Sequence, residues 1–244
     1  MGSQCRIALF GDLQVEQGGR RTARFQTQKI ATLLAYLAYH LGRAYPREVL
    51  IELLWPECLP SAGRNSLSVA LSSLRQLLEP PGVSAGSVLR ADRASVGLNP
   101  SVVTVDVVEF EKALRCAAAA RKPADRADCL AVAIKLYQDG LLPGYYEDWI
   151  RLEQDRTAGK YFKALQQLIQ HLEQVGDLKS AIDYAREGVG VDPLREDAHR
   201  ELIRLHVAAD QSADALQQYR QLEGILKREF EGTPSAETQA CLRD

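Results

Sequence analysis

Residues 61–78 (SAGRNSLSVALSSLRQLL) gather side chains that are suited to reading nucleic-acid bases. At about 100° per residue the spacing predicts a helix with one apolar side, formed by Leu67, Ala70, Leu71, Leu74 and Leu78. The opposite side is polar and holds Ser61, Arg64, Asn65, Ser68, Ser72, Arg75 and Gln76. Arg pairs bidentately with guanine, Asn or Gln pairs with adenine, and short Ser side chains let a helix approach a groove closely. A solvated amphipathic helix has the same periodicity, so the stretch alone leaves both interpretations open.

The charge of this predicted helix differs from that of an ordinary surface helix. No acidic residue follows Ser61 until Glu79, although surface helices usually mix Glu with Lys to form pairs four residues apart. Residues 1–105 carry 11 Lys and Arg against 7 Asp and Glu, whereas residues 106–244 carry 19 against 25. A basic first part and an acidic second part indicate two different tasks. The formal net charge of −2 argues against a histone-like or membrane-coating protein.

Composition and motifs exclude several other classes. The 244 residues, 46 % of them hydrophobic, predict two domains with a sizeable core. We expect no transmembrane helix and no signal peptide, because no apolar run approaches 18 residues and the N-terminus lacks the charged-then-apolar pattern. The five cysteines are scattered and odd in number, which predicts reduced thiols in a cytoplasm. We expect no metal site, cofactor or enzyme, because no His, nucleophile or phosphate-cradling motif is present.

The residues before this stretch predict a small sheet and two helices. Strands are expected at 5–10, 13–15 and 22–25, as an antiparallel sheet. Thr27 is the expected N-cap of a helix at 27–41, which Gly42 stops.

A second helix is expected to open with Pro46 at its first position. Its predicted apolar face is Val49, Leu50, Leu53 and Leu54. Trp55-Pro56 is expected to end it, because the residue before proline resists the helical conformation.

Short strands are also predicted after the polar-faced helix. They are expected at 88–90 and 95–98 around a turn at Asp92-Arg93, followed by a β-branched run at 102–105. A sheet, three helices and a hairpin follow the plan of a winged helix-turn-helix. In that plan the third helix enters the major groove, and the hairpin tip reaches phosphates or the minor groove.

Several motifs in this region resemble the OmpR-type winged-helix DNA-binding domain. They are Arg47-Glu48-x-Leu50, Leu54-Trp55-Pro56 and Asn65-Ser-Leu-x-Val-Ala-Leu-Ser-x-Leu-Arg75. Trp55-Pro56, Ala70-Leu71-Ser72-x-Leu74-Arg75 and Val105-Asp106 followed by Phe110 resemble in particular the SARP family of bacterial activators. Two positions depart from the family pattern: Ser73 stands where Arg is common, and Gly97-Leu98 stands where Gly-Tyr is usual.

The second part of the chain predicts helices with a 34-residue repeat. Helices are expected at 107–119 and 126–139, and a third opens at Trp149-Ile150. Ala181-Ile182 recurs as Ala215-Leu216, and Gly176-Asp177 recurs as Asp210-Gln211, which is a tetratricopeptide-like period. Asp192-Pro193 is expected to start a helix, with Asp as cap and Pro first. The segment resembles the bacterial transcriptional activator domain that follows the winged helix in SARPs, with landmarks at Gly140-x-Leu-Leu-Pro-Gly144, Glu147-x-Trp149 and Asp192-Pro193-Leu-Arg-Glu-Asp-Ala198.

The resemblance covers about residues 5–240 and implies a fold that is mainly α with a small β component. We expect an N-terminal winged helix-turn-helix at 5–105, followed by an all-α tetratricopeptide-like domain at 106–244. The family implies a transcriptional activator that binds direct repeats in double-stranded promoter DNA as a head-to-tail dimer. It also implies recruitment of RNA polymerase, including its sigma factor, at the nucleoid in the cytoplasm, and no membrane partner.

The candidate DNA-contacting residues come from three predicted elements. They are Arg47, Trp55, Arg64, Asn65, Ser68, Ser72, Arg75, Gln76, Arg90 and Arg93. Family positions implicate Arg47 and the indole of Trp55 in phosphate contact, and arginines at the wing suit phosphates or the minor groove. Alternatives stay open: Trp55 as core, Arg75 paired with a carboxylate of the second helix, and wing arginines that are merely solvated. A rival function is a helical-repeat interaction scaffold whose winged helix binds no DNA.

Overall fold

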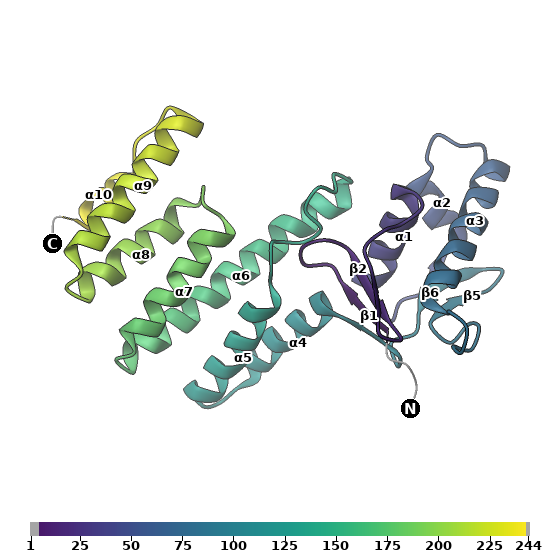
Figure 1. Cartoon of the computed structure of the whole chain (residues 1–244), viewed down its shortest axis with the longest axis horizontal. Coiled ribbons are helices and arrows are strands. Elements are labelled where there is room, and N and C mark those ends of the chain that lie inside the picture. Colours follow the sequence, from purple (N-terminus) through teal and green to yellow (C-terminus); the bar gives the residue numbers. More distant parts are fainter. Residues whose placement is uncertain (1–4, 243–244) are drawn as a thin grey trace. The chain divides into compact units, whose positions relative to one another are not determined.

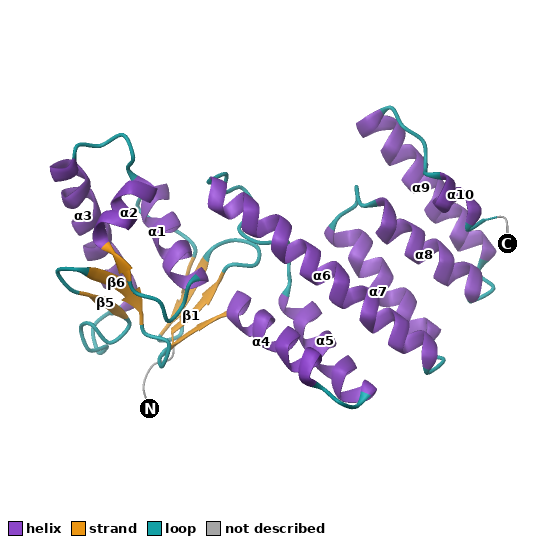
Figure 2. Ribbon diagram, turned by 180° about the vertical axis from the view of Figure 1, so that it is seen from behind, coloured by secondary structure: helices purple, strands orange, loops and turns teal. Residues whose placement is uncertain are grey.

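The computed structural model describes residues 5–242, so residues 243–244 of the predicted second domain lie outside the described residues. The chain packs into two compact units, and neither is a single stretch of sequence. The first consists of residues 5–112 and 139–154, and the second of residues 113–138 and 155–242. Every strand of the described residues belongs to the first unit, while the second is built from helices and loops (Figure 2). The predicted class, mainly α with a small β component, is confirmed.

The first unit contains two small sheets around three helices. Its elements in chain order are β1 (Cys5–Ala8), β2 (Gln14–Gln17), β3 (Arg20–Thr22), α1 (Gln28–Tyr39), β4 (Tyr45–Pro46), α2 (Arg47–Leu54), α3 (Pro60–Leu78), β5 (Leu89–Ala91), β6 (Ser95–Leu98) and β7 (Val103–Val105). One sheet has the order β3-β2-β1-β7 and the other β4-β6-β5. The antiparallel arrangement of β1, β2 and β3 is as predicted, but the third strand was expected at 22–25 and β3 instead ends at Thr22. The parallel pairing of β7 with β1 was not predicted.

The first strand ends earlier than its apolar sequence predicts, because its continuation is held by a side chain. The carboxylate of Asp106 accepts the amide of Leu9 at 2.9 Å and that of Phe10 at 3.0 Å. It also accepts the amide of Val107 at 2.8 Å. Burial raises the pKa of Asp106 above its usual value, although these amide bonds favour the ionised form. Asp106 therefore fixes the end of β1 to the start of the helix that follows β7.

Helices α1 and α2 match the predictions in most respects. Thr27 caps α1 by accepting the amide of Ile30 at 3.3 Å. Pro46 is the N-cap of α2 and belongs to β4, so its predicted place inside the helix is wrong by one position. Val49 was predicted to lie on the apolar face of α2, but it is 42 % exposed. The short helix buries only Leu50 and Leu54 fully.

Residues 139–154 return to the first unit and complete its core. The amide of Leu142 donates to the carbonyl of Leu9 at 2.8 Å, and Gly11 donates to the carbonyl of Gly140 at 2.7 Å. The ring of Trp149 then packs edge-on against Tyr36 of α1, with 5.2 Å between ring centroids. A segment that follows β7 by more than thirty residues is thus part of the winged-helix unit.

The second unit consists of helices, which Figure 1 draws in teal, green and yellow. They are α5 (Pro123–Leu136), α7 (Leu178–Val191), α8 (Glu196–Ala208), α9 (Ser212–Phe230) and α10 (Ala236–Ala240), together with parts of α4 (Asp106–Ala119) and α6 (Asp148–Gln174). Some positions 34 residues apart have matching environments, but the predicted pair Ile182 and Leu216 does not: Ile182 is 6 % exposed and Leu216 is 45 % exposed. Ala181 and Ala215 are buried, and Gly176 and Asp210 both have a left-handed backbone, at φ +81° and +61°.

Asp192-Pro193 does not start a helix, which corrects the prediction. Asp192 is the C-cap of α7, and its amide donates to the carbonyl of Gly188 at 3.2 Å. Its carboxylate accepts the amide of Leu194 at 3.1 Å, which makes a turn before α8 begins at Glu196. The side chain that was expected to cap α8 instead stabilises the loop between the two helices.

The cysteines also depart from the prediction of reduced thiols. Cys116 of α4 and Cys129 of α5 form a disulfide, with their Cα atoms 5.9 Å apart. The two helices follow one another in the chain and bring together residues that are 13 positions apart. Scattered spacing in the sequence gave no sign of this pairing.

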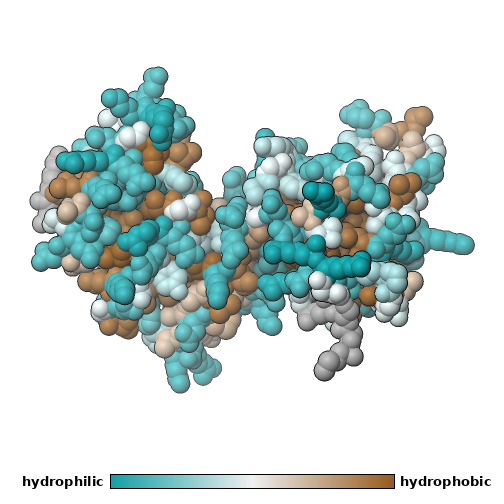
Figure 3. Space-filling model, in the orientation of Figure 1, coloured by the Kyte–Doolittle hydropathy of each residue, from teal (hydrophilic) through white to brown (hydrophobic). Residues whose placement is uncertain are grey.

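The surface mixes polar and apolar side chains. Large hydrophobic residues such as Leu59, Val69, Tyr146 and Leu152 are more than half exposed. On the face drawn in Figure 3, brown hydrophobic areas lie among teal hydrophilic ones. Among the described residues, no helix is long and apolar enough to cross a membrane.

Candidate nucleic-acid interface

Helix α3 has the two sides that the sequence predicts. Leu67, Leu74 and Leu78 are fully buried, and Ala70 and Leu71 are nearly so. The exposed side carries all of the predicted polar candidates: Arg64, Asn65, Ser68, Ser72, Arg75 and Gln76. Because α3 contains no acidic residue, the charged groups that this face presents to solvent are all cationic.

The close packing of α2 against α3 requires a glycine. A Cβ atom on Gly63 would lie 2.4 Å from Cγ2 of Ile51, closer than atoms in contact can come. Gly63 is buried in the first turns of α3, and Ile51 lies in the middle of α2. The missing side chain therefore lets the two helices approach, as a helix-turn-helix requires.

Arg47, at the start of α2, connects α3 to the hairpin. Its Nη1 donates to the carbonyl of Asp92 at 3.1 Å, and its Nη2 donates to Oγ of Ser68 at 3.3 Å. The Ser68 hydroxyl in turn donates to the carbonyl of Arg64 at 2.8 Å. A guanidinium has five N–H donors, so Arg47 keeps donors for a phosphate while it holds these two partners.

Arg75 makes a second connection between α3 and the hairpin. Its Nη2 donates to the carbonyl of Ala91, at the end of β5, at 3.3 Å. Figure 1 draws α3 alongside β5 and β6, which form the wing. The sequence left open a pairing of Arg75 with a carboxylate of α2. In the structure Arg75 instead donates to the Ala91 carbonyl of the wing. Arg47 and Arg75 therefore both set the position of the wing relative to α3.

Two carboxylates shape the loops on either side of β5. Glu79, the C-cap of α3, accepts the amides of Gly86, Val88 and Leu89 at 2.8 to 2.9 Å. Partial burial raises the pKa of Glu79, but these amides together with Arg75 outweigh it and lower the pKa below its ordinary value.

The Asp92 carboxylate likewise accepts backbone amides, at the wing turn. It accepts the amides of Ala94 and Ser95 at 2.7 Å each. These bonds lower the pKa of Asp92. The turn that carries Arg93 is therefore fixed by local hydrogen bonds rather than by burial.

The remaining candidates lie in the wing and at the end of α2. Arg90 in β5 and Arg93 in the wing turn are exposed. Trp55 is the C-cap of α2 and is partly exposed, so part of its ring remains accessible. Val69 was not selected from the sequence because it is apolar, yet it is 65 % exposed on the polar side of α3. The spacing that located its neighbours also locates Val69.

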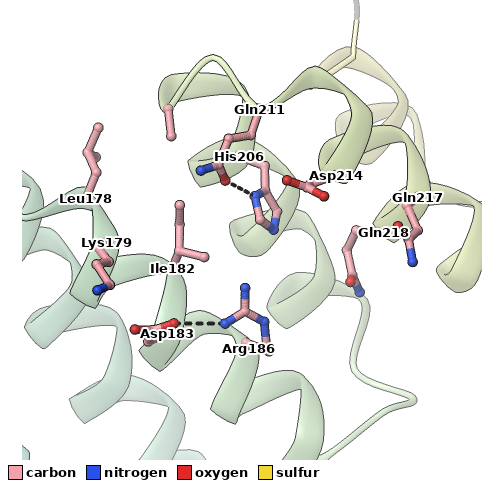
Figure 4. A pocket seen from close by; sticks show the side chains of 11 residues that line it. Leu178, Lys179, Ile182, Asp183, Arg186, His206, Gln211, Asp214, Gln217 and Gln218 are labelled. Atoms are coloured by element: carbon pink, nitrogen blue, oxygen red, sulfur yellow. Dashed lines mark hydrogen bonds and ion pairs between the residues drawn. The ribbon is translucent and has the colours of Figure 1, made fainter.

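A surface hollow lies on the helical unit, apart from the face of α3. Its volume is about 530 Å³, and it is lined by α7, the end of α8 and the start of α9. His206 is hydrogen-bonded to Gln211 at 2.7 Å, and Arg186 pairs with Asp183 at 2.8 Å, as Figure 4 shows. Its charges are mixed, and within residues 5–242 no group of His, Cys, Asp or Glu has the arrangement of a metal site.

The structure combines a winged helix with a helical-repeat domain, and comparisons with known proteins give the class of protein. Residues 105–243 match the family model of the bacterial transcriptional activator domain, and residues 25–90 match that of the C-terminal domain of transcriptional regulatory proteins. The chain belongs to the bacterial transcriptional activator domain family, and the SARP-type assignment from the sequence is confirmed. The matched families are transcriptional regulators, which confirms the expected class rather than an enzyme.

The chain is similar to a known mycobacterial regulator. It is 28 % identical over 225 residues to the transcriptional regulatory protein EmbR of Mycobacterium tuberculosis and of Mycobacterium bovis. The match covers 90 % of this chain and 58 % of those relatives. A solved structure of Mycobacterium tuberculosis EmbR, in complex with a low-affinity phosphopeptide, has a TM-score of 0.70 at 24 % identity and covers 99 % of this chain and 64 % of that one. This likeness shows a shared fold.

Proposed function

We propose that the protein is a sequence-specific transcriptional activator that binds promoter DNA through α3 and the wing. The observation that carries this proposal is the exposed side of α3, which is free of acidic groups and tied to a wing that carries further arginines. Arg47, Trp55, Arg64, Arg75, Arg90 and Arg93 are the proposed phosphate or minor-groove contacts. Asn65, Ser68, Ser72 and Gln76 are the proposed contacts to base edges.

The proposal divides the work between the two parts of the chain. Residues 5–105 would bind direct repeats in double-stranded DNA, and residues 106–244 would supply surfaces for a neighbouring protomer and for RNA polymerase with its sigma factor. Direct repeats require a head-to-tail contact between protomers, since a two-fold contact would require inverted repeats. The proposed place of action is the nucleoid in the cytoplasm. Family membership and the basic first part of the chain support this division.

Selection of bound DNA from a random pool tests the proposal. We expect enrichment of two copies of one short motif in the same orientation. Arg64→Ala and Asn65→Ala should each weaken binding to the selected DNA by about tenfold, within the 1–3 kcal/mol range of a good base or phosphate contact. Arg220→Ala, at an exposed arginine of α9, is the matched control and should leave the affinity unchanged.

Two outcomes would contradict the proposal. A folded protein that enriches no motif, alone or with RNA polymerase present, would favour the interaction scaffold. Equal affinity of Arg64→Ala, Asn65→Ala and wild-type protein for the selected DNA would show that α3 is not the reading element.

A further inference from the structure

Val69 lies in the middle of the exposed side of α3, where a valine has no part in the core. It is 65 % exposed. At about 100° per residue it lies about 40° around the helix from Asn65 and about 20° from Gln76. Ser68 and Arg75 lie about 100° or more away, and their hydrogen bonds connect them to Arg47 and to the wing. Asn65, Val69, Ser72 and Gln76 therefore form the central strip of the face, and Ser68 and Arg75 form its wing-side edge.

The neighbours of Val69 leave its methyl groups accessible from outside the helix. Asn65 stands one turn before it, and Ser72 and Ser73 stand one turn after it. Residues three and four apart are the neighbours on a helix surface, and none of these three has a long aliphatic chain that would cover a valine. The result is one apolar group within a strip that otherwise offers amides and hydroxyls.

One feature of the major groove matches such a group. The C5-methyl of thymine projects from the major-groove edge of a base pair and is recognised by apolar contact. Asn65 has the chemistry for the N6 and N7 atoms of adenine. Val69 lies about 6 Å further along the helix axis, at 1.5 Å per residue, and this distance reaches one or two base pairs beyond that adenine.

We propose that Val69 is a specificity-determining residue that reads a thymine methyl group beside the base pair read by Asn65. The inference rests on the proposed function, because it requires α3 to lie in the major groove. It assigns the strip two kinds of reading: hydrogen bonding by Asn65 and Gln76, and apolar contact by Val69.

Replacing thymine with uracil in the selected operator tests the inference, because only the C5-methyl is lost. Each thymine within one repeat is replaced singly. The wild-type protein should lose about fourfold in affinity at one of them, the change that burial of one methyl-sized group supports. Val69→Ala should lose about the same factor on the unmodified operator and should bind the thymine and uracil forms of that site equally well. Alanine is the best helix former, so the variant should keep the fold.

Val132→Ala, at a 54 % exposed valine of α5, is the matched control and should keep the full sensitivity to uracil. If Val69→Ala remains as sensitive to uracil as the wild type at every position, the inference is overturned while the proposed function stands. If the wild-type protein selects no operator at all, the proposed function has failed and the inference fails with it.

Discussion

The return of residues 139–154 to the winged-helix unit predicts that Trp149 stabilises a domain far from it in the sequence. The Trp149 ring lies 5.2 Å from the ring of Tyr36 and 6.0 Å from that of Tyr39, both in α1. Among the described atoms its indole nitrogen has no hydrogen-bond partner, so truncation costs apolar packing alone. Removal of a buried Trp side chain costs about 3–5 kcal/mol, and this ring is only partly buried. We expect Trp149→Ala to lower the free energy of unfolding of this unit by about 3 kcal/mol.

Tryptophan fluorescence, excited selectively over tyrosine, can follow this unit alone. The chain has two tryptophans, Trp55 and Trp149, and both belong to the winged-helix unit. In the Trp149→Ala variant Trp55 is the remaining reporter during urea unfolding. Leu152→Ala is the matched control, because Leu152 lies on the same helix and is 68 % exposed; its effect should stay within about 0.5 kcal/mol. A Trp149→Ala transition within 0.5 kcal/mol of wild type would refute the assignment of 139–154 to this unit.

Further predictions concern the wing, pH and the disulfide. Arg47→Ala removes the hydrogen bonds from α2 to the Asp92 carbonyl and to Ser68. DNA affinity should therefore fall at least tenfold while the midpoint of urea unfolding changes little. Unchanged affinity in a filter-binding titration would show that Arg47 is not part of the interface. Burial lowers the pKa of His199 in the folded chain below its ordinary 6.5. As the pH falls, His199 therefore binds a proton in the unfolded chain at a higher pH than in the folded chain. The contribution of His199 to the free energy of unfolding is therefore fully present above about pH 6.5 and is lost as the pH falls below it. Unfolding followed by circular dichroism should show a less stable helical unit at pH 5.5 than at pH 7.5. His199→Gln should reduce that difference. Reduction of the Cys116–Cys129 disulfide should destabilise the helical unit by about 3 kcal/mol through its short loop. Before reduction, thiol alkylation followed by mass spectrometry should modify exposed Cys58 but neither Cys116 nor Cys129; modification of all three would contradict the bond.

Local periodicity made α3 the most predictable element. Its buried and exposed sides follow from the positions of its leucines and from the absence of acidic residues. Both features lie within the 19 consecutive residues of the helix. Thr27 was predictable as a cap for the same reason, because an N-cap acts within three residues. Val69 was missed through the exclusion of apolar side chains, not through any lack of signal in the spacing.

Pairings between residues of different elements could not be read from the sequence. The parallel contact of β7 with β1, the packing of Trp149 on α1 and the Cys116–Cys129 bond each join residues whose local sequences carry no sign of the partner. Arg75 is a smaller case of the same kind. A long exposed side chain takes its partner from the tertiary arrangement, and here the partner is a backbone carbonyl of the wing.

The measurement that tests the central claim most directly is the salt dependence of binding to the selected DNA. Each phosphate neutralised by an arginine or lysine contributes about −0.9 to the slope of log affinity against log salt concentration. Arg47, Arg64, Arg75, Arg90 and Arg93 together predict a slope between about −4 and −5 per protomer. Replacement of Arg93 by alanine should make the slope shallower by about one contact. A slope near zero, unchanged in that variant, would contradict DNA binding by the winged helix and favour a protein-binding role.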